Sequence, residues 1–469
     1  MKLTSVQLDR AVGALLGGAV GDALGAPYEF KPPIAHHLKV VMKAGGAWEL
    51  GEWTDDTSMA IPIARVLARG DRLEGPALDE LVAAWTGWAR DAKDVGIQTR
   101  QVLNGLGSPT AAEARDSSRR VHERIGRSAG NGSLMRTGPV ALGYLDDVDG
   151  LIEAARAVSD LTHYEQDASD ACVIWSVAIR HAILTGVADV RVGVAALPAG
   201  RQARWLELVA EAETKQPAEI ANNGWVVAAL QAAWSAISHG DGFVDSVDRA
   251  VRAGDDTDTV AAIAGSLIGA ATGGSAIPAL WRRPLHGWPG LTARDLTELA
   301  VLAVRGGQPD EAGWPTAARF APSNLDTLVA HPHDPDVLLA SLAGLDRLPD
   351  DVDAVVSLCR IGSHQTDREH VEFWLVDRDG TNPNLDLVLA DAAATVAALR
   401  AEGKRVAIHC FEARSRTSAV ATLYATRELG IPVDVAKHDI AAALPDWAPA
   451  AFLVDATQRL SPPLAKEHP

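Results

Sequence analysis

Residues 254–264 read Gly-Asp-Asp-Thr-Asp-Thr-Val-Ala-Ala-Ile-Ala, so a dense acidic cluster runs straight into an apolar helical pattern. A second cluster, Thr54-Asp55-Asp56-Thr57, leads into a helical pattern in the same way. Carboxylates this crowded repel one another, and burying them without a counter-charge is costly. Mg2+ and Mn2+ prefer oxygen ligands and would remove that cost. Together the clusters indicate a metal centre, whereas each cluster alone would also suit a helix N-cap.

The segment from Val6 to about Arg305 is typical of an all-α domain. It is rich in Ala, Leu, Val and Trp, shows little period-two alternation, and has turns at Gly, Pro and Asp. Gly265 and Gly269 lie four residues apart on one helical face, which indicates close helix packing. Helices are expected over Met59–Ala68, Leu78–Arg90, Leu151–Ser159, Ala168–Leu184, Gly224–Ile237 and Thr259–Ala271.

The pattern changes near the end of this segment, and we predict domains over residues 1–305 and 323–469. Residues 306–322 are the predicted linker, because Pro and Gly are frequent there and helical periodicity is lost. Beyond it, strands alternating with helices predict a small α/β domain with a mainly parallel sheet. The strands are expected over Asp353–Ile361, Val371–Val376 and Arg405–His409, and the helices over Leu385–Leu399 and Ser415–Leu429.

Composition narrows the function classes. The formal net charge of -18 argues against loose electrostatic binding to nucleic acid or to an anionic membrane. Three scattered cysteines indicate a reducing compartment rather than a disulfide framework. The apolar stretch Ala11–Ala26 is interrupted by glycines and Asp22, so it is neither a signal peptide nor a membrane span. A cytoplasmic protein without a membrane partner is expected.

Five motifs lie in order between Leu3 and Arg305. They are Gly17–Glu29 (GGAVGDALGAPYE), Trp53–Thr57 (WTDDT), Gly130–Arg136 (GNGSLMR), Leu161–His163 (LTH) and Gly254–Thr259 (GDDTDT). These motifs closely resemble those of the ADP-ribosylglycohydrolase family and follow that family's order. The resemblance implies an all-α fold with a two-metal centre that holds two divalent cations, usually Mg2+ and in some members Mn2+.

The resemblance also implies a set of metal ligands. The family usually has Gly where this chain has Asp255. The extra carboxylate would either contact the second metal or face solvent. Carried over position by position, the ligands are Thr54, Asp55, Asp56, Asp256, Asp258 and Thr259.

Hydrolysis of a ribosyl bond needs a water activated on one face of the sugar and a ribose held on the other. Two cations can hold the ribose hydroxyls and lower the pKa of a bound water, and a neighbouring carboxylate then takes the proton. Asp55, Asp56 and Glu29 are the candidates for that carboxylate. Glu29 matches a position where some members of the family carry a catalytic glutamate on a mobile loop. Its alternative is a surface residue before Phe30.

The predicted substrate contacts are Asn131, Gly132, Ser133 and His163. The first three lie where the family's glycine-bearing loop contacts the diphosphate and the distal ribose, and N–H groups in such a turn can cradle phosphate oxygens. An ordinary Asn-Gly turn is the alternative. His163 matches a family histidine and is either a substrate contact or a structural residue.

The run Val406–Thr417 (VAIHCFEARSRT) places Cys410 after a predicted strand and Arg416 at the start of a predicted helix. It is similar to the phosphate loop of the cysteine-dependent, dual-specificity type protein phosphatases. The resemblance implies that Cys410 is a nucleophile and that Arg416 binds the phosphoryl oxygens. It also implies a general acid, for which Asp379 fits best and Asp377 is the alternative.

This loop departs from the phosphatase pattern in two ways. That pattern carries glycines at the positions of Ala413 and Ser415, because the backbone must curl tightly round the phosphate. Glu412 adds a negative charge beside the expected anion site. Both departures leave room for a phosphate-binding module without catalysis, or for a substrate other than phosphotyrosine.

The expected function is removal of ADP-ribose from a modified protein or small molecule by a metal-dependent hydrolase. Its C-terminal domain would bind or hydrolyse a phosphate ester. The alternatives are a non-catalytic scaffold that binds ADP-ribose and phosphate, and a phosphatase that the N-terminal domain regulates. The acceptor of ADP-ribose, the metal and the oligomeric state stay open.

Overall fold

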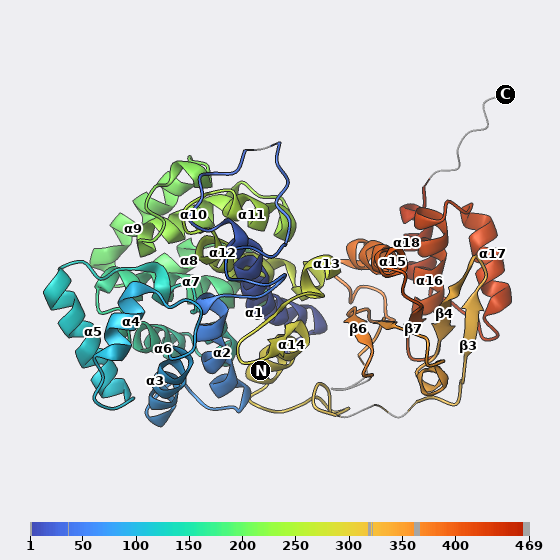
Figure 1. Ribbon diagram of the computed structural model, residues 1–469, viewed down its shortest axis with the longest axis horizontal. Coiled ribbons are helices and arrows are strands. Elements are labelled where there is room, and N and C mark those ends of the chain that lie inside the picture. The colour runs from blue at the N-terminus through green and yellow to red at the C-terminus, as the bar shows by residue number, and fades with distance from the viewer. Residues whose placement is uncertain (1, 36, 318–319, 321, 361–365, 463–469) are drawn as a thin grey trace. The chain divides into compact units, whose positions relative to one another are not determined.

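The computed structural model describes residues 2–35, 37–317, 320, 322–360 and 366–462, which form two compact units (Figure 1). The N-terminal unit comprises Met1–Ile277 and Trp281–Gln308, and the C-terminal unit comprises Pro278–Leu280 and Pro309–Pro469. Residues 318, 319 and 321 of the predicted linker lie outside the described residues, as does Ile361 at the end of a predicted strand.

The N-terminal unit is helical, and each helix that the sequence predicts there is present with small shifts at its ends. A two-stranded antiparallel hairpin, β1 (His286–Gly287) with β2 (Leu291–Thr292), is an addition to the predicted all-α fold. α13 (Ala279–Arg282) contains residues of both units. The other helices are α1 (Ser5–Gly25), α2 (Asp55–Ala68), α3 (Pro76–Trp88), α4 (Ile97–Asn104), α5 (Ala111–Ile125), α6 (Val148–Asp160), α7 (Gln166–Thr185), α8 (Arg191–Val194), α9 (Ala199–Ala212), α10 (Val226–Ser238), α11 (Gly242–Val251), α12 (Thr257–Thr272) and α14 (Ala293–Val304).

Helices α1 and α12 cross at backbone contact, which explains the glycines that the sequence places every fourth residue. A Cβ atom at Gly17 would lie 2.4 Å from the Gly265 carbonyl oxygen, and one at Gly269 would lie 2.1 Å from that of Gly13. The predicted close packing is therefore confirmed. The ladder runs antiparallel and ends where Gly25 meets the backbone of Asp258, so it brings the end of α1 to the start of α12.

The C-terminal unit contains a mixed five-stranded sheet in the order β3-β4-β7-β5-β6. β3 and β4 are antiparallel and were not predicted, whereas the pairings β4–β7, β7–β5 and β5–β6 are parallel. The strands are β3 (Leu328–His331), β4 (Asp334–Ala340), β5 (Ala354–Ser357), β6 (Glu369–Glu372) and β7 (Val406–His409), and the helices are α15 (Leu385–Ala401), α16 (Arg416–Leu423), α17 (Val433–Ala443) and α18 (Ala451–Leu460).

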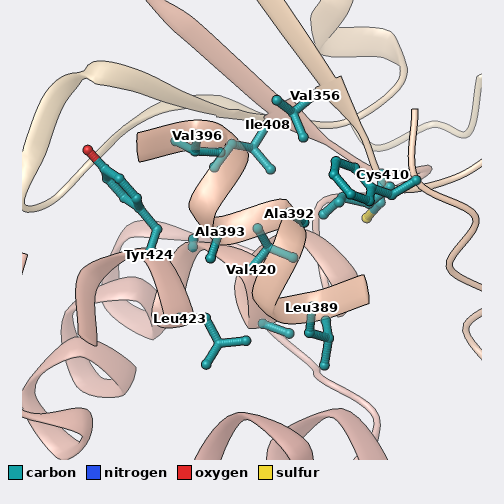
Figure 2. Packing of buried hydrophobic residues seen from close by; sticks show 14 of the residues in the cluster. Val356, Leu389, Ala392, Ala393, Val396, Ile408, Cys410, Val420, Leu423 and Tyr424 are labelled. Carbon is teal, nitrogen blue, oxygen red and sulfur yellow. The ribbon is translucent and has the colours of Figure 1, made fainter. Parts of the chain in front are cut away.

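Apolar side chains of the sheet and of helices α15 and α16 form the core of the C-terminal unit (Figure 2). Val356 of β5 and Ile408 of β7 are fully buried there, and Cys410 belongs to the same cluster. The predicted helix 415–429 is interrupted, because α16 continues as a π-helical turn over Tyr424–Glu428. Among the described residues, no helix is both long and apolar enough to cross a bilayer.

Candidate functional site

The two acidic clusters meet at the first turns of α2 and α12. The Thr54 Oγ1 atom lies 3.2 Å from Asp56 Oδ2 and 3.4 Å from Asp258 Oδ2. From α12, Thr259 Oγ1 lies 3.4 Å from the same Asp56 oxygen. Four of the six predicted metal ligands are thus in mutual contact, although more than two hundred positions separate the clusters in sequence.

Asp22 supports this meeting point and was not among the predicted site residues. It projects from α1 and is fully buried. Its Oδ1 accepts the Thr54 N–H at 2.8 Å, and its Oδ2 accepts the Thr57 N–H at 3.0 Å and the Thr57 hydroxyl at 2.6 Å. Asp22 therefore caps α2 from another helix, since Thr54 makes no side-chain cap of its own. Its signals in the sequence were one acidic residue within an apolar run and its place in the Gly17–Glu29 motif.

The carboxylates form two triads that share Asp258. Oxygen atoms of Asp22, Asp56 and Asp258 lie within 4.8 Å of one another, and so do oxygen atoms of Glu29, Asp256 and Asp258. Asp56 Oδ1 and Asp258 Oδ1 are buried and accept no hydrogen bond from any residue that the structure describes. Buried carboxylate oxygens without partners are costly, and an all-oxygen donor set is the one that Mg2+ and Mn2+ prefer. The residues present therefore fit two adjacent divalent cations.

The electrostatics of the triads point the same way. Burial, followed by the charge of Asp256, raises the pKa of Glu29 to about 8. Burial, followed by the charge of Asp94, raises the pKa of Asp55 to about 7. For Asp258, burial and then Asp256 raise the pKa well above its ordinary value. The site thus has more negative charge than its own side chains neutralise, which is the condition that bound cations relieve.

Asp55 and Asp255 take different positions. Asp55 is buried, and its Oδ2 accepts the Gly96 N–H at 3.2 Å from the segment before α4. It belongs to neither triad, although the charges of Asp22 and Asp256 act on it, and its role as a metal ligand stays a prediction. Asp255 is exposed and has a φ of 56°, the left-handed conformation that favours glycine. Its side chain therefore faces solvent, which decides between the two alternatives. Its backbone pairs with Lys31 and Phe30 and so holds the Glu29 loop against the start of α12.

The Asn131 turn reaches the second triad. Asn131 Nδ2 donates to Asp256 Oδ2 at 2.7 Å and to the Asn223 carbonyl at 3.0 Å. Asn223, which was not predicted, accepts the Asp256 N–H at 3.2 Å through its own side chain. Gly132 lies beside the His163 ring, because a Cβ atom there would be 3.3 Å from Nε2. Three of the four predicted substrate contacts thus border the second triad or the turn attached to it.

Ser133 is the exception. The residue is fully buried, and its hydroxyl lies near the Cys172 thiol. The Ser133 hydroxyl forms no hydrogen bond with any residue that the structure describes, and its role as a substrate contact stays a prediction. A turn with two glycine neighbours gives no sequence signal for which of its members points inward.

The Cys410 loop in the C-terminal unit follows β7 and ends at the start of α16. Cys410 is 2% exposed, and Ala413 has a φ of 61°. Ala413 thus takes the left-handed conformation that the phosphatase pattern reserves for glycine. The N–H groups of residues 412–416 donate to no acceptor among the described residues. Glu412 forms an ion pair with Arg414 at 3.6 Å, which offsets the negative charge noted in the sequence.

Asp377, the alternative general acid, is the one that reaches this loop. Its Oδ1 accepts the Ser415 hydroxyl at 3.0 Å, and its Oδ2 lies 3.7 Å from Arg416 Nε. Arg416 is anchored by donation from Nη1 to the carbonyl oxygens of Leu358 and Leu375. Asp379 is exposed and accepts the N–H of its neighbour Gly380 at 2.8 Å. In the described part of the chain Asp379 forms no hydrogen bond or ion pair with the loop, whereas Asp377 does, and the identity of the general acid stays a prediction.

The chain is similar to several known proteins. ADP-ribosylarginine hydrolase Tri1 of Pseudomonas putida (strain GB-1) is 33% identical over 291 residues, which cover 58% of this chain and 73% of the relative. ADP-ribosyl-(dinitrogen reductase) glycohydrolase of Rhodospirillum rubrum is 31% identical over 283 residues, covering 58% and 89%. The crystal structure of human DUSP28 is 20% identical, covers 30% of this chain and 97% of its own, and has a TM-score of 0.27.

A family model described as ADP-ribosylglycohydrolase matches residues 3–311. The match takes in both acidic clusters, the Asn131 turn and His163, and it spans more than half of the chain. The chain therefore belongs to the ADP-ribosylglycohydrolase family.

Proposed function

We propose that the N-terminal unit is a metal-dependent hydrolase that removes ADP-ribose from arginine side chains of modified proteins. The observation that carries the proposal is the pair of carboxylate triads sharing Asp258, with unpartnered buried oxygens in both Asp56 and Asp258. Support for arginine as the acceptor comes from the Pseudomonas putida relative, which is named for that bond. Mg2+ is the proposed cation, and Mn2+ is the alternative.

Each residue of the site has a separate role in this proposal. When bound, divalent cations would supply the positive charge that the triads lack and would act as Lewis acids toward substrate oxygens. Glu29 is assigned the role of taking a proton from the attacking water, because its carboxylate belongs to the triad with Asp256 and Asp258. Asn131 holds Asp256 in orientation, and Asp22 fixes the first turn of α2. Asp55 remains a proposed metal ligand, and its Oδ2 also accepts the Gly96 N–H.

Metal removal tests the proposal directly. The full chain should release ADP-ribose from a peptide carrying arginine-linked ADP-ribose when Mg2+ is present, and EDTA should reduce release to background. Addition of excess Mg2+ should restore it. A matched peptide with serine-linked ADP-ribose is the control for the acceptor, with free ADP-ribose measured by chromatography. Turnover that survives EDTA would contradict the metal centre, and calorimetric Mg2+-dependent binding of ADP-ribose without turnover would favour the scaffold alternative.

We further propose that the Cys410 loop of the C-terminal unit binds a phosphate ester and hydrolyses it. The support is the left-handed Ala413, the N–H groups of residues 412–416, which have no acceptor among the described residues, and Arg416 beside Asp377. Backbone N–H groups of a loop that leads into a helix can bind phosphate oxygens. In this scheme the Cys410 sulfur attacks phosphorus, Asp377 gives a proton to the departing oxygen, and water then cleaves the phosphocysteine.

Two variants separate hydrolysis from binding in this loop. Cys410→Ser should reduce release of p-nitrophenol from p-nitrophenyl phosphate by at least about 10³-fold while leaving vanadate affinity within a factor of three. Arg416→Met should lose both p-nitrophenyl phosphate hydrolysis and vanadate binding. Cys359→Ser, which removes another buried thiol of the same unit, is the matched control and should retain both. If the wild type shows no turnover yet binds vanadate, the loop is a phosphate-binding module.

A further inference from the structure

His163 is the last member of a buried hydrogen-bonded chain. Arg136 is fully buried, with its guanidinium 4.2 Å from the centre of the Trp85 ring. Its Nη2 donates to Thr162 Oγ1 at 2.6 Å and to the Val158 carbonyl at 3.1 Å. Thr162 Oγ1 in turn lies 2.7 Å from His163 Nδ1. The chain therefore runs from a cation in the core to one nitrogen of the imidazole.

The donors and acceptors along this chain determine which imidazole nitrogen of His163 is protonated. Arginine has only donors, so the Thr162 oxygen is an acceptor toward Arg136. The Thr162 hydroxyl hydrogen then needs an acceptor, and among the described residues His163 Nδ1 is the one within reach. A nitrogen that accepts a hydrogen bond carries no proton, and a neutral imidazole then has its proton on Nε2.

The charge state of the ring agrees with this assignment. Burial, followed by the positive charge of Arg136, lowers the pKa of His163 well below its usual value. Burial lowers the pKa of Arg136 to about 10, which leaves the guanidinium charged at neutral pH. His163 is thus neutral under ordinary conditions, and only its tautomer remains to be set.

His163 Nε2 lies beside the turn formed by Gly130 and η2 (Asn131–Ser133). A Cβ atom at Gly130 would lie 3.4 Å from Nε2, and one at Gly132 would lie 3.3 Å from it, so a side chain at either position would crowd this nitrogen. Nε2 makes no hydrogen bond with any residue that the structure describes, although the side chain is 1% exposed. An N–H left without an acceptor in such a place costs free energy that a ligand oxygen would recover.

The turn itself is held rigidly around that nitrogen. Gln98 Nε2 donates to the Thr162 carbonyl at 3.0 Å and to the Ser128 carbonyl at 2.8 Å, so one side chain joins the His163 segment to the start of the turn. On the other side, the Asn131 N–H donates to the Gly224 carbonyl at 3.1 Å. The donor on His163 and the carboxylate of Asp256 thus border the same short turn.

We infer that Arg136 and Thr162 are positioning residues that hold His163 as the Nε2–H tautomer, so that Nε2–H donates to an oxygen of the ADP-ribosyl group at the Gly130–Gly132 turn. The inference rests on the proposed function only for the identity of that ligand, because the tautomer is a property of the free protein. A structural histidine would need no fixed donor on the face that the two glycines leave open.

The tautomer is measured first, without substrate. Full-length protein labelled with ring-15N histidine should show, for His163, a protonated Nε2 and an unprotonated Nδ1 in long-range 1H–15N spectra at pH 7. The signal is assigned as the one that disappears in His163→Gln. A protonated Nδ1 in the wild type would overturn the inference, whether or not the protein hydrolyses anything.

Two substitutions at one position then test the role of the hydroxyl. Thr162→Val keeps the shape and removes the hydroxyl, whereas Thr162→Ser keeps the hydroxyl. In Thr162→Val the His163 signals should shift to a mixture of tautomers, and the Kd for ADP-ribose in Mg2+ should rise about tenfold, as expected for one lost hydrogen bond. Thr162→Ser should restore both readings.

The melting temperature serves as the control for a merely structural effect. If Thr162→Val and Thr162→Ser lose stability equally and neither changes the tautomer, Thr162 is only a packing residue and the inference fails. If the tautomer changes in Thr162→Val but ADP-ribose affinity does not, the donor has no ligand and the inference also fails. Correct tautomers with no ADP-ribose binding by the wild type would instead contradict the proposed function.

Discussion

Asp258→Asn is expected to reduce Mg2+-dependent release of ADP-ribose by more than about 100-fold, the upper range for residues that only support metal ligands. Asp258 is the one carboxylate that both triads share, so its loss affects both cation positions at once. Asparagine keeps the size of the side chain and one oxygen but removes the negative charge. The measurement is steady-state release of ADP-ribose from the arginine-linked peptide.

When no metal is bound, the Asp258→Asn variant should be more stable than the wild type. Burial, and then the charges of Asp256, Asp56 and Glu29, raise the pKa of Asp258, so replacing its carboxylate with a neutral amide removes an unfavourable buried charge from the metal-free protein. We therefore expect a higher melting temperature than the wild type in EDTA and little further rise on adding Mg2+. The wild type should gain stability with Mg2+, because a ligand that binds only the folded state stabilises it.

Asp255→Asn is the matched control for this prediction. It makes the same chemical change a few residues away, at a side chain that faces solvent. Turnover and the Mg2+-induced rise in melting temperature should both match the wild type. A centre placed elsewhere would be indicated by an Asp258→Asn variant that keeps the Mg2+ response, or by an Asp255→Asn variant that loses it.

Whether the sequence predicts a residue of this site depends on how that residue acts. Asp56, Asp256 and Asp258 stand in dense acidic clusters, so residue type and spacing are enough to predict them. Asp22 acts through the backbone N–H groups of residues 54 and 57, and Asn223 acts through the N–H of Asp256. Such bonds depend on a backbone that only the folded chain brings within reach. No spacing rule could therefore single out either residue.

The C-terminal unit shows a different limit. The β3–β4 hairpin was missed because Pro332 and Pro335 stand at its turn, and proline argues against a strand. Pro335 is nevertheless the second residue of β4, next to the point where the β3–β4 register shifts. Ala413 stands where the phosphatase pattern has glycine, yet it adopts the left-handed φ that glycine would supply. The type of a residue determines which backbone conformation it prefers. The surrounding fold can hold the residue in another conformation at a cost of about 1–3 kcal/mol.

Gly17→Ala is expected to destabilise the N-terminal unit, whereas Gly18→Ala, one residue along the same helix, should be neutral or stabilising. A Cβ atom at Gly17 would lie 2.4 Å from the Gly265 carbonyl oxygen and 3.0 Å from a Phe243 ring carbon. The nearest obstacle is backbone, so α1 and α12 must move apart. Overpacking of this kind typically costs about 1–3 kcal/mol, which outweighs the gain of about 1 kcal/mol in helix propensity.

At Gly18 the balance is reversed. The nearest atoms to a Cβ there are the Ala262 carbonyl oxygen at 3.5 Å and Ser266 Cβ at 3.6 Å, which are ordinary contacts. The propensity gain then stands alone, and the free energy of unfolding in urea should rise by up to about 1 kcal/mol. Gly17→Ala should also weaken the Mg2+ response, because α1 carries Asp22 to Asp258 along this contact. Equal shifts for the two variants would show that the glycine ladder does not set the distance between α1 and α12.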